Sequence, residues 1–273
     1  MKCKICNNSD NISDGISVLC LKCETRFNLN AKNIDYLYEG GQDIPTDKKI
    51  LQRIENSKNR IKIIKNYINC KNFVLVDIGS GSGEFLQEGK KWFTEAIGFD
   101  INKTLIKYCK SKNLEVYYGD FSREKVNVND NQNCFISISH VLEHLEDPIN
   151  FLHKIVLNMN KGDILWIEIP LWTGKSFFKK KYSWKLWYEE HYYLFSSKVF
   201  LEIENNFDLK KIADGKRIFD SMKSMRKLNI LKIVFQNPIK SLKFIYLKDK
   251  KRKGIRFLDY IFEDFGFSIY IKQ

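Results

Sequence analysis

Apolar runs that alternate with amphipathic stretches predict a sheet covered by helices. Phe73 to Val76 is a continuous apolar run, which is the pattern of a strand buried on both faces. Further strands are predicted at 96–99, 114–118, 134–138, 163–169, near 207–213 and at 267–271. A helix is predicted over 148–158. Because strands alternate with helices, we expect an α/β fold with a doubly wound, parallel sheet of seven strands.

The first 70 residues precede this sheet and divide into two parts. Residues 1–30 contain paired cysteines, and residues 31–70 contain a Gly- and Pro-bearing loop followed by a helix. The helix is predicted from Asp47 to Tyr67, because Thr46 or Asp47 can cap it and isoleucines recur at near-helical spacing. Residues 71–273 are expected to form the α/β domain, with a basic helical insertion at about 214–266.

Four of the seven cysteines follow a metal-ligand spacing. Cys3, Cys6, Cys20 and Cys23 form C-x2-C-x13-C-x2-C, so two knuckles can supply the four sulfurs of a tetrahedral Zn²⁺ site. Four ligands leave no position for water, so the zinc would be structural, and its binding would help a short segment to fold. The alternative is four unrelated cysteines. The other three cysteines lie in apolar contexts, as buried thiols do.

A glycine-rich turn follows the first strand of the predicted sheet. The segment reads Asp77-Ile78-Gly79-Ser80-Gly81-Ser82-Gly83 and leads into a helical pattern. Glycine lets a ligand approach the bare backbone. Neither the dinucleotide pattern G-x-G-x-x-G nor the phosphate-binding G-x4-G-K-[ST] is present. What remains is an acid followed by G-x-G-x-G; the alternative is a turn that binds no ligand.

This pattern resembles the first motif of class I S-adenosylmethionine-dependent methyltransferases, which implies a Rossmann-like sheet. Asp100 stands at the tip of the strand after the glycine turn, where a carboxylate can accept both hydroxyl hydrogens of a ribose. The resemblance also places the carboxylate of Asp120 near the adenine amine and Phe121 against the ring. The candidate donor-binding residues are Asp77, Gly79, Ser80, Gly81, Gly83, Asp100, Ile101, Asp120, Phe121 and His140.

The segment Ser139 to Pro148 looks like the motif that follows strand four in the same superfamily. Within it, the chain is most similar to zinc-ribbon-bearing methyltransferases of sugars and small metabolites, including deoxysugar C-methyltransferases. In that group a Tyr-x-Glu-His motif lines the substrate pocket, and here it reads Tyr188-Glu189-Glu190-His191. The resemblance covers roughly residues 1–210 and the last strand. The deoxysugar enzymes carry a further C-terminal domain that this sequence lacks, so the resemblance does not identify the substrate.

A methyltransferase must align a nucleophile with an activated methyl group and remove its proton. Histidine has a suitable pKa for a general base. His140, His144 and His191 follow strand ends, whereas His153 fits a helix face. We expect His191 to be the base, oriented by Glu190, with Tyr188 and His144 holding the substrate. Glu143 is a further candidate.

The formal charge of +13 is concentrated in one segment. Residues 211–256 carry a net charge of +12, and the rest of the chain is about neutral. Such a segment attracts an anionic small acceptor, such as a nucleotide-sugar or phosphorylated metabolite, or makes peripheral contact with a membrane. No aromatic-interleaved RNA module is evident, so nucleic acid is not favoured. With no apolar leader and no uncharged run of ~18–20 residues, we expect a cytoplasmic protein.

The sequence therefore predicts a methyltransferase that uses S-adenosylmethionine on an oxygen or carbon of a small acceptor, in the biosynthesis of capsule or other surface polysaccharide. The acceptor atom and the oligomeric state stay open. One alternative is an rRNA or tRNA methyltransferase that binds RNA through the zinc ribbon and the basic insertion. The other is a non-catalytic zinc-ribbon adaptor.

Overall fold

A seven-stranded sheet forms the centre of the molecule. The computed structural model describes residues 2–31, 44–119, 121, 132–172, 190–217 and 265–273. The strand order is β10-β11-β8-β7-β4-β5-β6. Strands β4 to β8 pair in parallel, and β11 pairs antiparallel with both β8 and β10. The bounds are β4 (Phe73–Ile78), β5 (Ala96–Asp100), β6 (Glu115–Tyr118), β7 (Asn133–Ser139), β8 (Ile164–Pro170), β10 (Leu209–Arg217) and β11 (Phe265–Lys272). The predicted doubly wound fold is confirmed.

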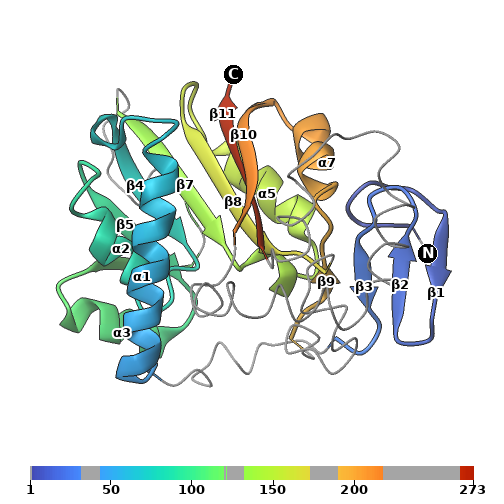
Figure 1. The fold of residues 1–273 in the computed structure, drawn as a ribbon, viewed down its shortest axis with the longest axis horizontal. Helices are drawn as coiled ribbons and strands as arrows, with labels where there is room; N and C mark the ends of the chain where they lie inside the picture. Colours follow the sequence, from blue (N-terminus) through green and yellow to red (C-terminus); the bar gives the residue numbers. More distant parts are fainter. Residues whose placement is uncertain (1, 32–43, 120, 122–131, 173–189, 218–264) are drawn as a thin grey trace, which may run out of the picture.

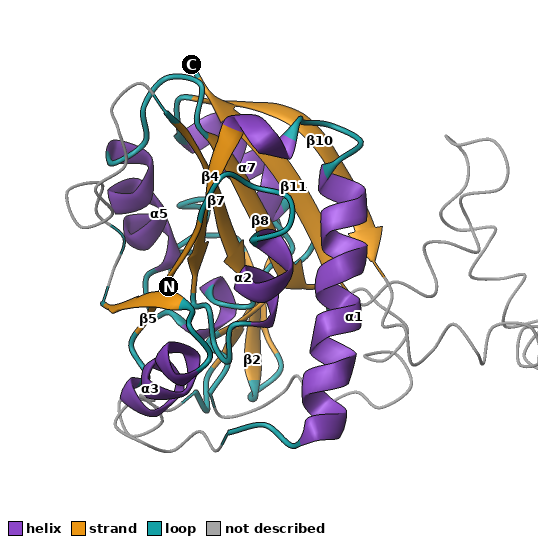
Figure 2. Ribbon diagram, turned by 90° about the vertical axis from the view of Figure 1, so that its left-hand side faces the viewer, coloured by secondary structure: helices purple, strands orange, loops and turns teal. Residues whose placement is uncertain are grey.

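Helices cover both faces of this sheet, and Figure 2 shows α1 and α5 on opposite sides of it. On one face, Leu75, Phe135 and Trp166 belong to a buried cluster with α1, α2 and α3. On the other face, Val74, Val76 and neighbouring residues pack with α5 and α7. The helices are α1 (Asp47–Ile64), α2 (Glu84–Gly89), α3 (Lys103–Ser111), α5 (Pro148–Leu157) and α7 (Val199–Asn206). Helix α1 ends at Ile64, before the predicted Tyr67.

Local chemistry determines where the helices next to the site begin. The Asn102 side chain accepts a hydrogen bond from the backbone N–H of Leu105 and so caps α3. Asp147 caps α5 in the same way, with Pro148 in the first turn, where no backbone N–H is needed. Both helices therefore start directly after a strand end or a motif that the sequence analysis singled out.

The strand order changes direction at β4, because the strands that follow it in sequence lie on both sides of it in the sheet. β4 pairs with β5 on one side and with β7 on the other. The carboxyl ends of β4 and β7 are neighbours, since Ile78 lies opposite Ile138. In open α/β sheets, ligands bind at the carboxyl ends of the strands at such a switch point.

The N-terminal residues form a separate small sheet that a later strand completes. Its strands β1 (Asn11–Ser13), β2 (Ser17–Cys20) and β3 (Arg26–Asn28) pair antiparallel, and β9 (Tyr193–Leu194) pairs with β3. Figure 1 shows β9 reaching this sheet at one end of the molecule. We call residues 2–31 the cysteine module. Its buried Ile5, Cys20 and Cys23 belong to the same apolar cluster as β4, β7 and α5.

No described helix is long and apolar enough to cross a bilayer. Because β10 ends at Arg217 and β11 begins at Phe265, the predicted insertion at about 214–266 is shortened to residues 218–264. These residues lie outside the described part of the chain, and so do residues 173–189.

Candidate active site

The glycine turn, residues 79–83, folds back over β5. The backbone N–H groups of Gly79 and Ser80 both donate to the carbonyl oxygen of Phe99, at 2.8 and 3.1 Å. Gly79, Gly81 and Gly83 have φ angles of 72°, 56° and 83°, a region in which residues with a Cβ are strained. A Cβ on Gly81 would meet nothing within 4 Å. The turn therefore presents open backbone at this residue.

The carboxylate of Asp100 is joined to the glycine turn. Its Oδ2 accepts a hydrogen bond from the N–H of Gly81 at 2.7 Å, and its Oδ1 accepts one from the N–H of Asn102 at 2.8 Å. Each carboxylate oxygen retains lone pairs for a further donor. Burial raises the pKa of Asp100, although these backbone hydrogen bonds partly offset the shift. Ile101, the next residue, is half-buried.

The acid before the turn, Asp77, is buried within β4. Burial raises the pKa of its carboxyl to about 7, while the nearby Arg60 guanidinium and a hydrogen bond with Ser137 oppose the shift. The negative charges of Asp100 and Glu84 raise it further. Asp77 therefore changes its charge close to neutral pH.

The structure describes only one of the two adenine-site candidates, Phe121. Phe121 is buried, and its ring meets that of Phe99 edge to face with centroids 5.8 Å apart. Asp120 lies outside the described residues.

The segment after β7 begins with a residue of unusual conformation. His140 has a φ of 57°, rare for a residue with a Cβ. Its Nδ1 lies 3.3 Å from Glu143 Oε1, and its Nε2 lies 3.4 Å from Glu168 Oε1. Arg60 Nη2 donates to the same Glu168 oxygen at 3.1 Å. A network whose two carboxylates are buried thus joins α1, β8 and the segment after β7.

The charges of this network stabilise one another. Burial would lower the pKa of His140, but the Glu143 and Glu168 carboxylates outweigh it and raise the pKa to about 9. Burial likewise opposes ionisation of Glu143, yet the hydrogen bond from His140 and the nearby His144 and His191 hold its pKa below the ordinary value. His140 and Glu143 therefore form an ion pair at neutral pH.

Two histidines that are distant in sequence meet beside Glu143. The rings of His144 and His191 lie edge to face with centroids 4.4 Å apart. One ligating atom from each of Glu143, His144 and His191 lies within 4.8 Å of the others. We call these three residues the histidine cluster. The Nδ1 of His144 also lies 3.1 Å from the backbone carbonyl oxygen of Glu190, and Tyr188 lies outside the described residues.

The histidine cluster and the glycine turn are neighbours. A Cβ on Gly79 would clash with the Val141 side chain, because Val141 packs directly against this glycine. Val141 begins the short turn that carries Glu143 and His144, since the N–H of His144 donates to its carbonyl oxygen at 3.0 Å. The short turn that carries Glu143 and His144 is thereby held against the glycine turn through Val141.

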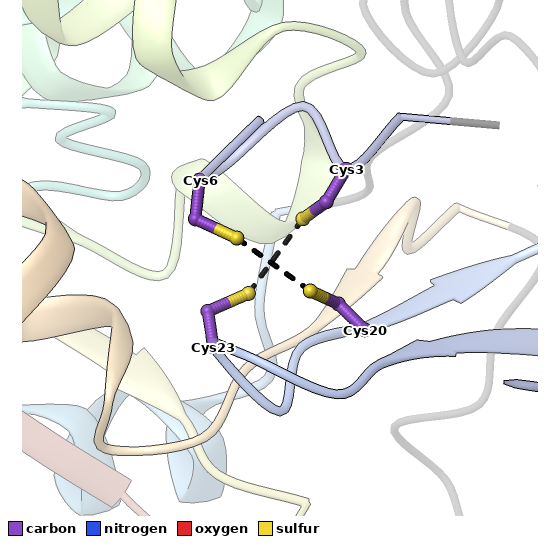
Figure 3. Close-up of side chains that lie close together, drawn as sticks. All are labelled: Cys3, Cys6, Cys20 and Cys23. Atoms are coloured by element: carbon purple, nitrogen blue, oxygen red, sulfur yellow. Dashed lines mark hydrogen bonds between the residues drawn. The ribbon is translucent and has the colours of Figure 1, made fainter. Parts of the chain in front are cut away.

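The four cysteine sulfurs point toward a common centre (Figure 3). Cys3 Sγ lies 3.6 Å from Cys23 Sγ, and Cys6 Sγ lies 3.5 Å from Cys20 Sγ, with all four within 4.8 Å of one another. Sulfurs placed tetrahedrally at about 2.3 Å from a zinc ion are separated by about 3.8 Å. The donor set and spacing therefore fit Zn²⁺.

Comparison with known proteins identifies the family. Residues 27–213 match the profile of a family described as "Methyltransferase domain", which is more than half of the chain. The chain belongs to the class I S-adenosylmethionine-dependent methyltransferases.

Solved methyltransferases share this fold. The chain is similar to a SAM-dependent methyltransferase from Archaeoglobus fulgidus, with 21% identity, a TM-score of 0.50, and coverage of 81% of this chain and 94% of that one. It is also similar to an S-adenosylmethionine-dependent methyltransferase from Mesorhizobium loti, with 9% identity, a TM-score of 0.51 and coverage of 80% and 99%.

One curated relative has a name that describes an RNA methyltransferase. It is the ribosomal RNA small subunit methyltransferase A of Mycoplasmopsis synoviae (strain 53), 30% identical over 88 residues. The match spans 32% of this chain and 34% of that protein, about a third of the length of each.

The glycine turn of this methyltransferase can accommodate the methyl donor, S-adenosylmethionine. S-adenosylmethionine carries two positive groups, its ammonium and its sulfonium, and the carboxylates of Asp77, Glu84 and Asp100 interact at this turn. Opposite charges attract strongly where water is partly excluded. The open space beside Gly81 leaves room for a ligand against the backbone. The residues present therefore fit the cofactor of the family.

Three residues of this methyltransferase matter to the site but did not emerge from its motifs. Glu168 is a buried carboxylate in the otherwise apolar β8, and Arg60 lies on the buried side of α1 with Ile61 and Ile64. A charged residue within an apolar pattern is the signal that could have indicated both. Asn28 donates from Nδ2 to the carbonyl oxygen of His191 at 3.0 Å, and nothing in the sequence indicated this contact.

Proposed function

We propose that this protein methylates an oxygen or carbon atom of a small, anionic acceptor, such as a nucleotide-sugar or phosphorylated metabolite in capsule or other surface-polysaccharide synthesis. The observation that carries the proposal is the position of the histidine cluster against the glycine turn, through the contact of Val141 with Gly79. A methyl donor at the turn and an acceptor at the cluster would then be neighbours, as in-line transfer requires.

The donor site consists of the glycine turn and the ends of the neighbouring strands. Asp100, already oriented by the N–H of Gly81, is proposed to hold the ribose hydroxyls. The side chains proposed to surround the adenine are Ile101, Asp120 and Phe121. Those proposed to hold the methionine part are Asp77, Gly79, Ser80, Gly81, Gly83 and His140.

The acceptor chemistry requires a proton to leave as the methyl group arrives. When bound, S-adenosylmethionine supplies a methyl group activated by its sulfonium. His191 is proposed to accept the proton of an acceptor hydroxyl or of an enolisable carbon. His144, whose pKa burial lowers, stays neutral at pH 7 and can hold the acceptor by a hydrogen bond. Glu190 and Tyr188 are proposed to complete this site.

The cysteine module is proposed to be a zinc ribbon that supports the acceptor side. The sulfur geometry carries this proposal, and β9 links the module to His191. Metal analysis of purified protein should find one structural zinc per chain. Cys20→Ser should lose it, and Cys70→Ser, at a buried cysteine outside the cluster, should keep it. Equal zinc in both variants would contradict the assignment.

A donor-consumption assay tests the proposed acceptor class. S-adenosylhomocysteine formation is measured against a panel of nucleotide-sugars, phosphorylated metabolites and their uncharged counterparts. We expect turnover with an anionic member and little with its neutral analogue, because residues 211–256 carry a net charge of +12. Equal turnover with anionic acceptors and their neutral analogues would contradict the proposal of an anionic acceptor.

RNA is the second candidate acceptor, favoured by the match to the ribosomal RNA methyltransferase. Binding to RNA through the basic segment should weaken steeply with salt, because each phosphate contact releases counterions. RNA methylation with such a salt dependence would replace the small-acceptor proposal. Calorimetry with S-adenosylmethionine tests the third possibility, a non-catalytic adaptor, which an absence of donor binding would favour.

A further inference from the structure

We propose that the histidine cluster is a second metal site, which holds a divalent cation such as Mn²⁺ or Zn²⁺ at the acceptor. Two imidazoles and one carboxylate offer ligand atoms within 4.8 Å of one another. Borderline divalent cations bind such mixed nitrogen and oxygen sets. The cysteine module is a different site, with four sulfur ligands and other residues.

Glu143 has a carboxylate oxygen available for an ion. The side chain is 1% exposed, and its Oε1 is engaged by His140. Its other oxygen, Oε2, is buried and has no hydrogen-bond partner in the described part of the chain. An unsatisfied carboxylate oxygen is costly to bury. A cation at Oε2 would remove this cost.

The surroundings orient the other ligands as in known metal sites. His144 Nδ1 faces the carbonyl oxygen of Glu190 at 3.1 Å, so Nδ1 carries the hydrogen and Nε2 keeps its lone pair for a metal. The main chain of His191 is held by Asn28, which donates to its carbonyl oxygen. His140 gives Glu143 the hydrogen bond that ligating carboxylates usually have.

The proposed ion would specify the acceptor as an oxygen. Three protein ligands leave coordination positions open, and a hydroxyl bound there has a lowered pKa. The hydroxyl proton leaves to water, and the oxygen forms the new bond to the methyl carbon. The carbon–sulfur bond breaks, with its electron pair staying on sulfur. In the metal-bound form His191 is a ligand, and the ion takes over its role in deprotonation. This chemistry rests on the proposed function, but ion binding does not.

Mn²⁺ binding to the protein alone tests the site without donor or acceptor. One molar equivalent of Zn²⁺ is first added to fill the four-thiolate site, and free Mn²⁺ is then measured by electron paramagnetic resonance. We expect one Mn²⁺ per chain, with binding weakened by roughly tenfold or more in Glu143→Gln and His144→Ala. His153→Ala is the matched control and should bind as the wild type does, because His153 lies exposed on α5.

The outcomes separate this proposal from the proposed function. If Glu143→Gln unfolds, as a melting curve would show, His144→Ala carries the comparison, since His144 is only half-buried. Co²⁺ is the second probe, and its absorption bands distinguish nitrogen and oxygen ligands from thiolates. No binding of either ion, or equal binding by the variants, overturns the metal site. Methyl transfer without it would leave the proposed function intact.

Discussion

Individual charges at the glycine turn connect donor binding with pH. Asp77 is buried beside Arg60, with Glu84 and Asp100 nearby, and its carboxyl has a pKa of about 7 in the free protein. Bound S-adenosylmethionine would bring positive charge to this carboxyl and favour its ionised form. A proton must then leave as the donor binds near neutral pH.

Donor affinity should therefore increase as the pH rises from about 6 to about 8. The raised pKa of Asp77 means that the free protein holds a proton below about pH 7 and must release it on binding. Calorimetry in buffers of different ionisation enthalpy measures this release. Asp77→Asn should bind the donor more weakly and with much less dependence on pH. An unchanged pH profile in this variant would show that another group titrates.

His191 should matter for turnover far more than for donor binding. His191→Asn removes the imidazole nitrogen that accepts the proton or binds the ion, and general-base groups contribute about 10²–10⁴-fold. Steady-state kinetics should show a loss of that order, with a donor dissociation constant within about threefold of the wild-type value. His153→Asn is the control and should leave both quantities unchanged. Full turnover by His191→Asn would remove His191 from the mechanism.

At the scale of elements, the two-residue strand β9 links the cysteine module to the acceptor side. It pairs with β3, and Asn28 at the end of β3 donates hydrogen bonds to the two residues that directly precede β9. Asn28 Nδ2 donates to the His191 carbonyl oxygen at 3.0 Å, and its N–H donates to that of Tyr192 at 2.9 Å. The module therefore positions the backbone of His191.

Replacing Asn28 with Ala should lower both stability and turnover. The buried carbonyl oxygen of His191 would lose its side-chain donor, which costs about 1–3 kcal/mol when no other donor replaces it. Denaturant unfolding measures this loss, and kcat should fall more than donor affinity because the effect is on the acceptor side. Asn30→Ala, at an exposed residue of the same module, should behave as the wild type. Equal effects of the two substitutions would contradict a positioning role for Asn28.

The elements also show what the sequence could predict. The strands of the large sheet were predictable because apolar runs such as 164–170 are long and buried on both faces. Strand β9 was not predictable, because the two residues Tyr193–Leu194 are too few to show an alternation of apolar and polar positions. They form a strand only through their pairing with β3. Helix α7 was not predicted either, because Lys198, the residue before it, is not a capping residue that would mark its start.

For the whole molecule, spacing along the chain predicted the glycine turn and Asp100, because both lie at ends of neighbouring parallel strands. The motifs predicted that His144 and His191 share the acceptor site, but the contact between their rings could not be derived from sequence, since 46 residues separate them and β9 brings them together. The network of Arg60, Glu168 and His140 likewise depends on the packing of α1 against the sheet. Tertiary packing, rather than local pattern, assembles the acceptor side.

A crystal structure with S-adenosylhomocysteine is the most direct test of the whole account. We expect the ribose hydroxyls within hydrogen-bond distance of the Asp100 carboxylate, the backbone of Gly79 to Gly83 against the homocysteine part, and the sulfur facing the histidine cluster. A nucleoside bound elsewhere, or a sulfur directed away from His144 and His191, would contradict the account.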